Sequence, residues 1–202
     1  MKNLLKKRWP WLLAFTVLIV ALILLLVRCG GKDAGLPTLT VETPQKLSKT
    51  KTTEFTLDVT ISNLGDALYP AMSMSIAFDA SRLEFLGVEE GNVFVYDTEN
   101  TTGQQLPEWS YDVASSNASG KINIMYLDLT GGKHAFSKNL LAEEDNVVLR
   151  LRFRLKGSVR TGDVMDLVVE DAVFAASDET LSLAMTRETL RVRNGKLVIG
   201  EG

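Results

Sequence analysis

The stretch Val147-Val-Leu-Arg-Leu-Arg-Phe-Arg-Leu155 decides the fold class of this chain. Its apolar residues occupy alternate positions, and Arg150, Arg152 and Arg154 fall between them. Because side chains alternate between the two faces of a β-strand, the pattern predicts a strand with one face in a core and one in solvent. An arginine row can also bind anions or nucleic acid. The acidic residues at 143–145 favour an ordinary solvated face instead.

The same period of two recurs along most of the chain. Turn signals such as Gly131-Gly132 and Gly162-Asp163 separate the alternating stretches, and no helix of ordinary length is required. Many short strands at regular spacing predict an all-β chain folded as a β-sandwich or jelly roll. The predicted strands are 39–41, 55–61, 72–78, 83–88, 93–96, 109–113, 122–129, 147–155, 167–169, 173–175 and 190–199.

The first thirty residues differ from the rest. Four basic residues precede an uninterrupted apolar stretch that as a helix, at about 1.5 Å per residue, would span most of a hydrocarbon core. Basic residues stay on the cytoplasmic side, so we predict a cytoplasmic tail at 1–8, a transmembrane signal-anchor at 9–29, a linker at 30–37 and an external domain at 38–200. The residues expected to form the membrane anchor are Trp11, Leu12, Leu13, Phe15, Leu18, Leu22, Leu25 and Val27.

The end of this apolar stretch leaves a second interpretation open. Residues 24–28 offer no small-residue cleavage site for a secretory signal. Leu26-Val27-Arg28-Cys29 is similar to a bacterial lipoprotein motif except at Arg28, where a small residue is expected. Lipidation of Cys29 is therefore the alternative to a signal-anchor, and both place the domain outside the membrane.

Composition excludes several classes of function. Cys29 is the only cysteine, so the external domain has no internal disulfide, and one histidine, His134, argues against a metal site built from histidines. The net charge of -3 combines a basic tail with a more acidic remainder, which gives no electrostatic case for nucleic acid. No nucleophile motif or calcium-loop pattern occurs, and the acidic residues are scattered. We therefore expect no enzyme activity, metal or cofactor.

The segment 122–129 is apolar on both faces. Ile122, Ile124 and Tyr126 fall on one face, whereas Met125 and Leu127 fall on the other together with Leu129. One of the two faces must then lie outside the core, where an exposed apolar surface usually indicates a partner. The alternative is that a loop covers it, such as the one between residues 129 and 147. Small residues at Ser73, Ser75 and Ala77 would suit a flat docking surface on a neighbouring strand.

At these residues the chain resembles the cohesin family. A strand that ends in Phe78-Asp79 and turns into Leu83-Glu84 is the most specific feature, followed by Val-Phe-Ala at 173–175. The resemblance extends over nearly all of residues 38–199, through the stretches 55–63, 74–88, 121–128 and 148–156. It implies a nine-stranded jelly roll that binds dockerin modules, in a bacterium of the Gram-positive type.

The resemblance also implies where the partner binds. Cohesins hold the dockerin on one sheet face, and many carry Asn and Asp on the strand where this chain has Ala71 and Ser73. That difference points to a divergent dockerin or to none. The partner-binding residues carried over to this chain are Ser73, Ser75, Ala77, Trp109, Tyr111, Ile124, Tyr126, Asp128, Leu181 and Leu183, with Ile124, Tyr126 and Asp128 expected to point outward.

We therefore expect a membrane-anchored extracellular cohesin-like module that captures dockerin-bearing proteins for polysaccharide degradation. A carbohydrate-binding module of the same fold is the second interpretation, which would need a row of exposed aromatic residues. The candidates for such a row are Trp109, Tyr111, Tyr126, Tyr96 and Tyr69. A structural protein of the cell envelope is the third.

Overall fold

A computed structural model describes residues 35–44, 46–48, 53–64, 67–91, 108–129, 131, 134–136, 146–177, 185–186 and 188–201 of the chain. Residues 37–202 form one compact unit, and of the unit before it only Gly35 and Leu36 are described. Within these described residues, none of the helices has the length and apolar character needed to cross a membrane. The anchor predicted at 9–29, Cys29 and the strand predicted at 93–96 lie outside the described residues.

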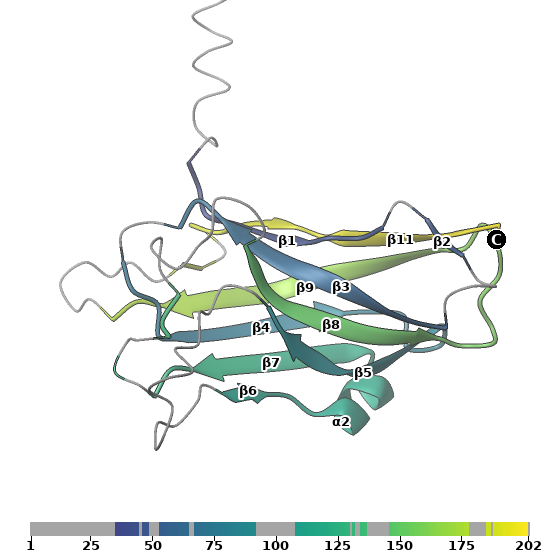
Figure 1. Ribbon diagram of the computed structural model, residues 1–202, viewed down its shortest axis with the longest axis horizontal. Helices are drawn as coiled ribbons and strands as arrows, with labels where there is room; N and C mark the ends of the chain where they lie inside the picture. The colour runs from purple at the N-terminus through teal and green to yellow at the C-terminus, as the bar shows by residue number, and fades with distance from the viewer. Residues whose placement is uncertain are drawn as a thin grey trace, which may run out of the picture. The chain divides into compact units, whose positions relative to one another are not determined.

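Two β-sheets make up the unit (Figure 1). The first has the strand order β10-β1-β3-β8-β5, and the second has the order β2-β11-β9-β4-β7-β6. The strands of the first sheet are β10 (Arg191–Arg193), β1 (Thr38–Val41), β3 (Glu54–Ser62), β8 (Val147–Leu155) and β5 (Leu83–Glu90). Those of the second are β2 (Leu47–Ser48), β11 (Gly195–Gly200), β9 (Val164–Ala175), β4 (Ala71–Ala77), β7 (Lys121–Leu127) and β6 (Glu108–Ser110).

The predicted all-β sandwich is confirmed, with differences in the strand count. The described residues form eleven strands, not nine. The stretches 167–169 and 173–175 belong to the single strand β9. This strand is long since it pairs with β11 at one end and with β4 at the other. The stretch 190–199 is divided at Asn194, whose side-chain oxygen accepts a hydrogen bond from Val169 N at 3.0 Å.

A short helix stands where the sequence predicted the end of a strand. Of the segment 109–113, only Trp109 and Ser110 pair with β7, and α2 (Val113–Ser119) follows. Asp112 caps its first turn, since the carboxylate accepts a hydrogen bond from Ser115 N at 2.6 Å. Gly120 ends it with a φ of 69°, a left-handed conformation that glycine adopts without a steric penalty.

The core lies between the sheets and is rich in aromatic rings. Phe153 of β8 is fully buried, and its ring lies 5.4 to 6.0 Å from the rings of Phe55, Phe78 and Phe85. Phe55 lies on β3 and Phe85 on β5, and Phe78 directly follows β4. Burying the apolar face of β8 against them is what the alternation in 147–155 predicted.

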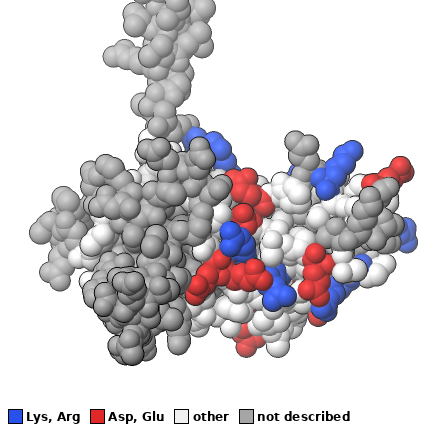
Figure 2. Space-filling view, in the orientation of Figure 1, with Lys and Arg blue, Asp and Glu red and all other residues white. Residues whose placement is uncertain are grey.

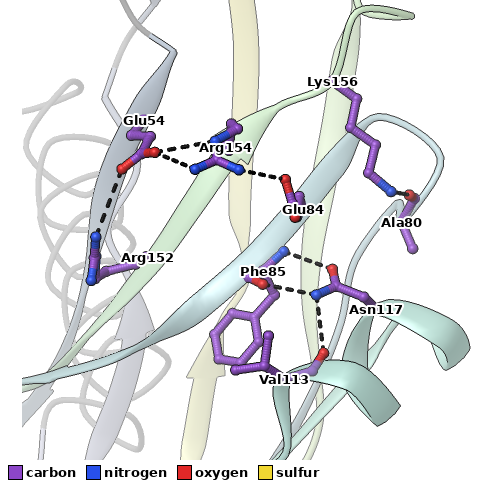
Figure 3. A network of polar contacts seen from close by, with 9 residues as sticks. All are labelled: Glu54, Ala80, Glu84, Phe85, Val113, Asn117, Arg152, Arg154 and Lys156. Carbon is purple, nitrogen blue, oxygen red and sulfur yellow. Dashed lines mark hydrogen bonds and ion pairs between the residues drawn. The ribbon is translucent and has the colours of Figure 1, made fainter.

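The arginines of β8 lie on the solvated face, as predicted. Arg154 lies between Glu54 of β3 and Glu84 of β5, at 2.5 and 3.0 Å (Figure 3). Arg152 pairs with Glu89 at 3.2 Å and reaches Glu54 at 3.7 Å. The hydrogen bond from Arg154 holds the pKa of the Glu54 carboxyl below its usual value. On the face turned to the viewer in Figure 2, basic and acidic side chains adjoin one another rather than gathering by sign.

Candidate partner-binding face

The outer face of β9, β4 and β7 is built on a row of small residues. On β4, Ala71, Ser73, Ser75 and Ala77 point outward, while Met72, Met74 and Ile76 are buried. The structure therefore confirms that Ser73, Ser75 and Ala77 lie on the outer surface. A strand with such short side chains leaves the surface low between its neighbours.

The outward residues of β7 are larger and more exposed. Met125 is 61% exposed and Leu127 is 49% exposed, and Leu129 beyond the strand is 55% exposed. In the register of the sheet, Met125 lies opposite Ser73 and Leu127 lies opposite Ala71. Long apolar side chains of β7 thus lie beside the short outward side chains of β4.

Ile124, Tyr126 and Asp128 do not point outward, and that prediction is wrong. Ile124 is 0% exposed, Tyr126 is 2% exposed and Asp128 is 7% exposed. The Tyr126 hydroxyl donates a hydrogen bond to the backbone oxygen of His134 at 2.8 Å. The Asp128 carboxylate accepts one from His134 N at 3.3 Å, so both side chains bind the backbone of His134.

The neighbours of these residues in the sequence carry a signal that the prediction missed. Lys121 and Asn123 are in phase with Met125 and Leu127, whereas Ile122, Ile124 and Tyr126 share a face without a charge or an amide. Because a cation and an amide are costly to bury without partners, the face with Lys121 must be the solvated one. Both sides of the strand are otherwise apolar, so hydrophobicity alone could not distinguish them.

The side chains of β4, β7 and β9 enclose a shallow, open hollow with an apolar lining. Ala71, Ser73 and Ala175 provide little side-chain bulk, and longer side chains rise beside them. In the register, Val173 of β9 and Met125 of β7 lie on opposite sides of Ser73. The residues that line the hollow at the surface are Ala71, Ser73, Met125, Leu127, Val173 and Ala175.

The same face becomes polar towards the other end of β4. The Ser75 hydroxyl donates a hydrogen bond to Asn123 Oδ1 at 2.7 Å, and Asp171 lies opposite Ser75 on β9. Lys121 and Glu170 form an ion pair with 2.7 Å between Nζ and Oε2. We call the first half the apolar hollow and this second half the polar end.

Two further predicted site residues, Trp109 and Tyr111, do not join this face. Trp109 is half-buried, and its ring centroid lies 4.8 Å from that of the buried Tyr126. Tyr111 packs edge-on against Phe85, which belongs to the other sheet, with the ring centroids 5.9 Å apart. Leu181 and Leu183 lie outside the described residues.

The structure assembles no row of exposed aromatic side chains in its described part. Tyr111 is the only aromatic side chain there that is exposed, at 37%, while Tyr69 and Tyr126 are buried. Tyr96 lies outside the described residues. Nor do three His, Cys, Asp or Glu side chains gather at any one place in the described ranges where they could hold a metal.

The fold and this face define a β-sandwich binding module. The cohesin domain model matches residues 40–190, which is most of the chain, and the chain belongs to the cohesin family. Members of the family are non-catalytic binding modules. A search of curated proteins found no match.

Solved cohesin structures share the fold. The third cohesin of ScaC from Acetivibrio cellulolyticus, in complex with a ScaB dockerin mutated in its C-terminal helix, has 13% identity and a TM-score of 0.59, covering 82% of this chain and 99% of its own. The OlpA cohesin in the Coh-OlpA-Doc918 complex from Clostridium thermocellum has 17% identity and a TM-score of 0.59, with coverages of 81% and 99%. The cohesin module of a family 33 glycoside hydrolase from Clostridium perfringens has 12% identity and a TM-score of 0.55, with coverages of 84% and 100%.

Proposed function

We propose that this chain captures dockerin-bearing proteins on the outer face of β9, β4 and β7. The observation that carries the proposal is the exposure of Met125 and Leu127 beside the small residues of β4. Large apolar side chains standing in solvent around a hollow lose water-exposed area when a partner covers them, which favours association. The ScaC and OlpA cohesins are both recorded in complexes with dockerins, which supports the choice of partner.

The test measures dockerin binding to variants of the full-length chain. The probes are purified dockerin modules encoded in the genome of origin. Ser75→Arg places a long cation on the face, and Met125→Glu places a charge at the hollow, so each should weaken binding by about 2 kcal/mol or more, as substitutions at binding hot spots do. Both residues are at the surface, so both variants should keep the melting temperature of the parent within a few degrees.

The matched control is Thr56→Arg, which places the same side chain on an exposed position of β3 in the other sheet. Binding should stay at the parent value. If no dockerin binds the parent chain, or if Thr56→Arg weakens binding as much as Ser75→Arg, the proposed face is wrong. Insoluble cellulose and xylan, tested in parallel, would reveal glycan binding in place of protein binding.

We further propose that the unit is held outside the cell membrane by residues 9–29. The support is the unbroken apolar stretch from Trp11 to Val27 behind a basic flank. Full-length protein should stay with membranes during carbonate extraction, and external protease should reach residues beyond Gly35. If Cys29 carries a lipid, Cys29→Ser should release the protein, whereas a signal-anchor should not respond. A soluble form that begins near Gly30 would contradict the anchor.

The captured proteins are proposed to be enzymes of polysaccharide degradation. The Clostridium perfringens module lies within a family 33 glycoside hydrolase, which supports a link between this fold and carbohydrate-active enzymes. The link is tested by a pull-down in which the proteins retained by the full-length chain, but not by its Ser75→Arg variant, are sequenced. A retained set with dockerins and without glycan-cleaving domains would contradict it.

A further inference from the structure

A polar pocket lies on the outer face of the first sheet, and the two sheets with the core between them separate it from the apolar hollow. We propose that this pocket binds a neutral polyhydroxylated ligand of the sugar class. The proposed dockerin capture uses the outer face of the other sheet, so this inference goes beyond it and does not depend on it. The pocket has a volume of about 380 Å³, which falls within the range of about 300 to 1,000 Å³ of small-molecule sites.

A row of side chains that crosses four strands lines the pocket. In the register of the sheet, Thr40 of β1 lies between Arg193 of β10 and Thr60 of β3. Val147 of β8 continues the row beyond Thr60. Both threonines are half-buried and Arg193 is exposed. Because adjacent strands are about 4.8 Å apart, the row extends about 14 Å across the sheet.

The charged groups of the pocket balance one another. Asp58 is paired with Arg150, with 3.2 Å between Oδ1 and Nε, and the Glu42 carboxylate accepts a hydrogen bond from the Thr60 hydroxyl at 3.3 Å. Arg193 forms no ion pair with any described residue. Glu42 and Asp58 carry two negative charges, and Arg150 and Arg193 carry two positive charges, so the sum is zero. The pocket therefore favours neither anions nor cations through its net charge.

Asn146 supplies an acceptor that has no partner. The residue directly precedes β8 and lines the pocket. Its Oδ1 is shielded from solvent but accepts no hydrogen bond from the described residues. An unpaired buried acceptor is costly, so such an atom in a folded protein indicates a missing partner. Rotation about the Cβ–Cγ bond, whose torsion has a broad range, can turn this oxygen towards the pocket, where a ligand hydroxyl would donate to it.

These groups match the hydroxyl groups of a sugar. A hydroxyl can both donate and accept hydrogen bonds, so a sugar can bond the Glu42 carboxylate, the Arg193 guanidinium and the Thr60 hydroxyl at the same time. Ile61 and Val147 are the only apolar residues among the described ones that line the pocket. An apolar ligand would therefore remove water from the polar groups without replacing their hydrogen bonds.

The experiment applies the full-length chain, held in a detergent without a sugar head group, to an array of immobilised oligosaccharides. The neutral members are fragments of cellulose, xylan, mannan and galactan, and oligogalacturonate of the same lengths is the charged comparison. At least one neutral oligosaccharide should retain the chain. Oligogalacturonate should bind at least tenfold more weakly, because the pocket has no surplus positive charge to replace the hydration of its carboxylates.

Variants then test the polar groups of the pocket with the retained oligosaccharide. Arg193→Ala and Glu42→Ala should each weaken binding about tenfold in calorimetric titrations, whereas Glu42→Gln keeps an acceptor oxygen and should lose less. Arg160→Ala and Glu90→Ala are the matched controls, since they change exposed residues outside the pocket, and binding should stay at the parent value. All four side chains are exposed, so the melting temperature should stay near that of the parent.

Met125→Glu separates this site from dockerin capture, because it alters the apolar hollow and should leave oligosaccharide binding unchanged. Arg193→Ala should in turn leave dockerin binding unchanged. An array that retains no neutral oligosaccharide, or a loss with Arg160→Ala as large as that with Arg193→Ala, would overturn this inference and leave the proposed dockerin capture untouched. Loss of oligosaccharide binding in Met125→Glu would place the sugar on the other face and overturn it as well.

Discussion

Asn117 of α2 binds the backbone of Phe85 through both atoms of its side-chain amide. Phe85 N donates to Asn117 Oδ1 at 2.8 Å, and Asn117 Nδ2 donates to Phe85 O at 2.8 Å and to Val113 O at 3.0 Å (Figure 3). β5 is the last strand of its sheet, and an edge strand presents unpaired backbone groups. The Asn117 amide therefore takes the place of a neighbouring strand at Phe85.

Removing this amide should destabilise the unit. Asn117→Ala leaves the Phe85 N–H and C=O without these partners, which should lower the free energy of unfolding by about 1 to 3 kcal/mol in urea titrations. Ser119→Ala, in the same helix, removes an exposed hydroxyl whose hydrogen bonds to Ser115 and Lys121 water can replace, so it should change the free energy of unfolding by less than about 0.5 kcal/mol. Equal effects of the two changes would mean that the hydrogen bonds between Asn117 and the Phe85 backbone do not contribute to stability.

Truncating the ring at the centre of the core should be more costly. Phe153→Ala removes a fully buried ring that contacts three other rings, and it should lower the free energy of unfolding by about 3 to 5 kcal/mol. Arg152→Ala, the preceding residue on the solvated face, should cost about 1 kcal/mol or less, since exposed ion pairs contribute little. A loss of less than about 1 kcal/mol for Phe153→Ala would contradict its place in the core.

Two adjacent residues of β7 should separate binding from stability. Tyr126→Ala removes a buried ring and the hydrogen bond to His134 O, so it should cost about 3 to 5 kcal/mol of stability. Met125→Ala truncates an exposed side chain and should leave the melting temperature nearly unchanged while weakening dockerin binding. Thermal melts and binding titrations of both variants give the comparison. The reverse pattern would restore Tyr126 as an outward contact.

The ion pairs of Glu54 should make stability depend on pH in a defined direction. The pKa of Glu54 is lowered in the folded state, chiefly by its hydrogen bond with Arg154, so its ionised form favours folding. This contribution is complete above the ordinary glutamate pKa of about 4.3 and is lost as the pH falls through the lowered value. Glu54→Gln should therefore destabilise the unit at neutral pH, and the difference from the parent should vanish in acid.

An arginine variant supplies the control for this pH dependence. In an Arg154→Gln background the first cause of the lowered pKa is absent, so Glu54→Gln should then have a smaller effect at neutral pH. Urea midpoints measured from neutral pH to below the ordinary glutamate pKa test both statements. A difference that grows as the pH falls would have the wrong sign.

Much of the fold follows from alternation in the sequence. The segment 147–155 is a strand with the predicted bounds and faces, because its arginines can be solvated on one side only. The helix at Val113–Ser119 escaped prediction since its Ser and Asn residues are weak helix formers. Its local caps, Asp112 and Gly120, were visible in the sequence and mark both ends.

The site was predictable on one strand and not on the next. On β4, small outward residues alternate with Met72, Met74 and Ile76, so the two faces differ in bulk. On β7, both faces are apolar around Met125 and Tyr126, and the resemblance to the family suggested the wrong one. The contribution of Val173 and Asp171 required the register of β9 with β4, which pairs segments about a hundred residues apart and has no local signal.

Met125 gives the binding face a chemical vulnerability that the core does not share. Met72, Met74, Met165 and Met185 are each at most 3% exposed, whereas Met125 is 61% exposed. Oxidants such as peroxide reach an exposed thioether first and convert it to a sulfoxide, which is polar. Among the described methionines, Met125 beside the hollow is therefore the first to be oxidised. Oxidative damage would then weaken partner binding before it destabilised the fold. A bound partner would shield the same sulfur, and the extent of sulfoxide formation at Met125 would then report occupancy of the face.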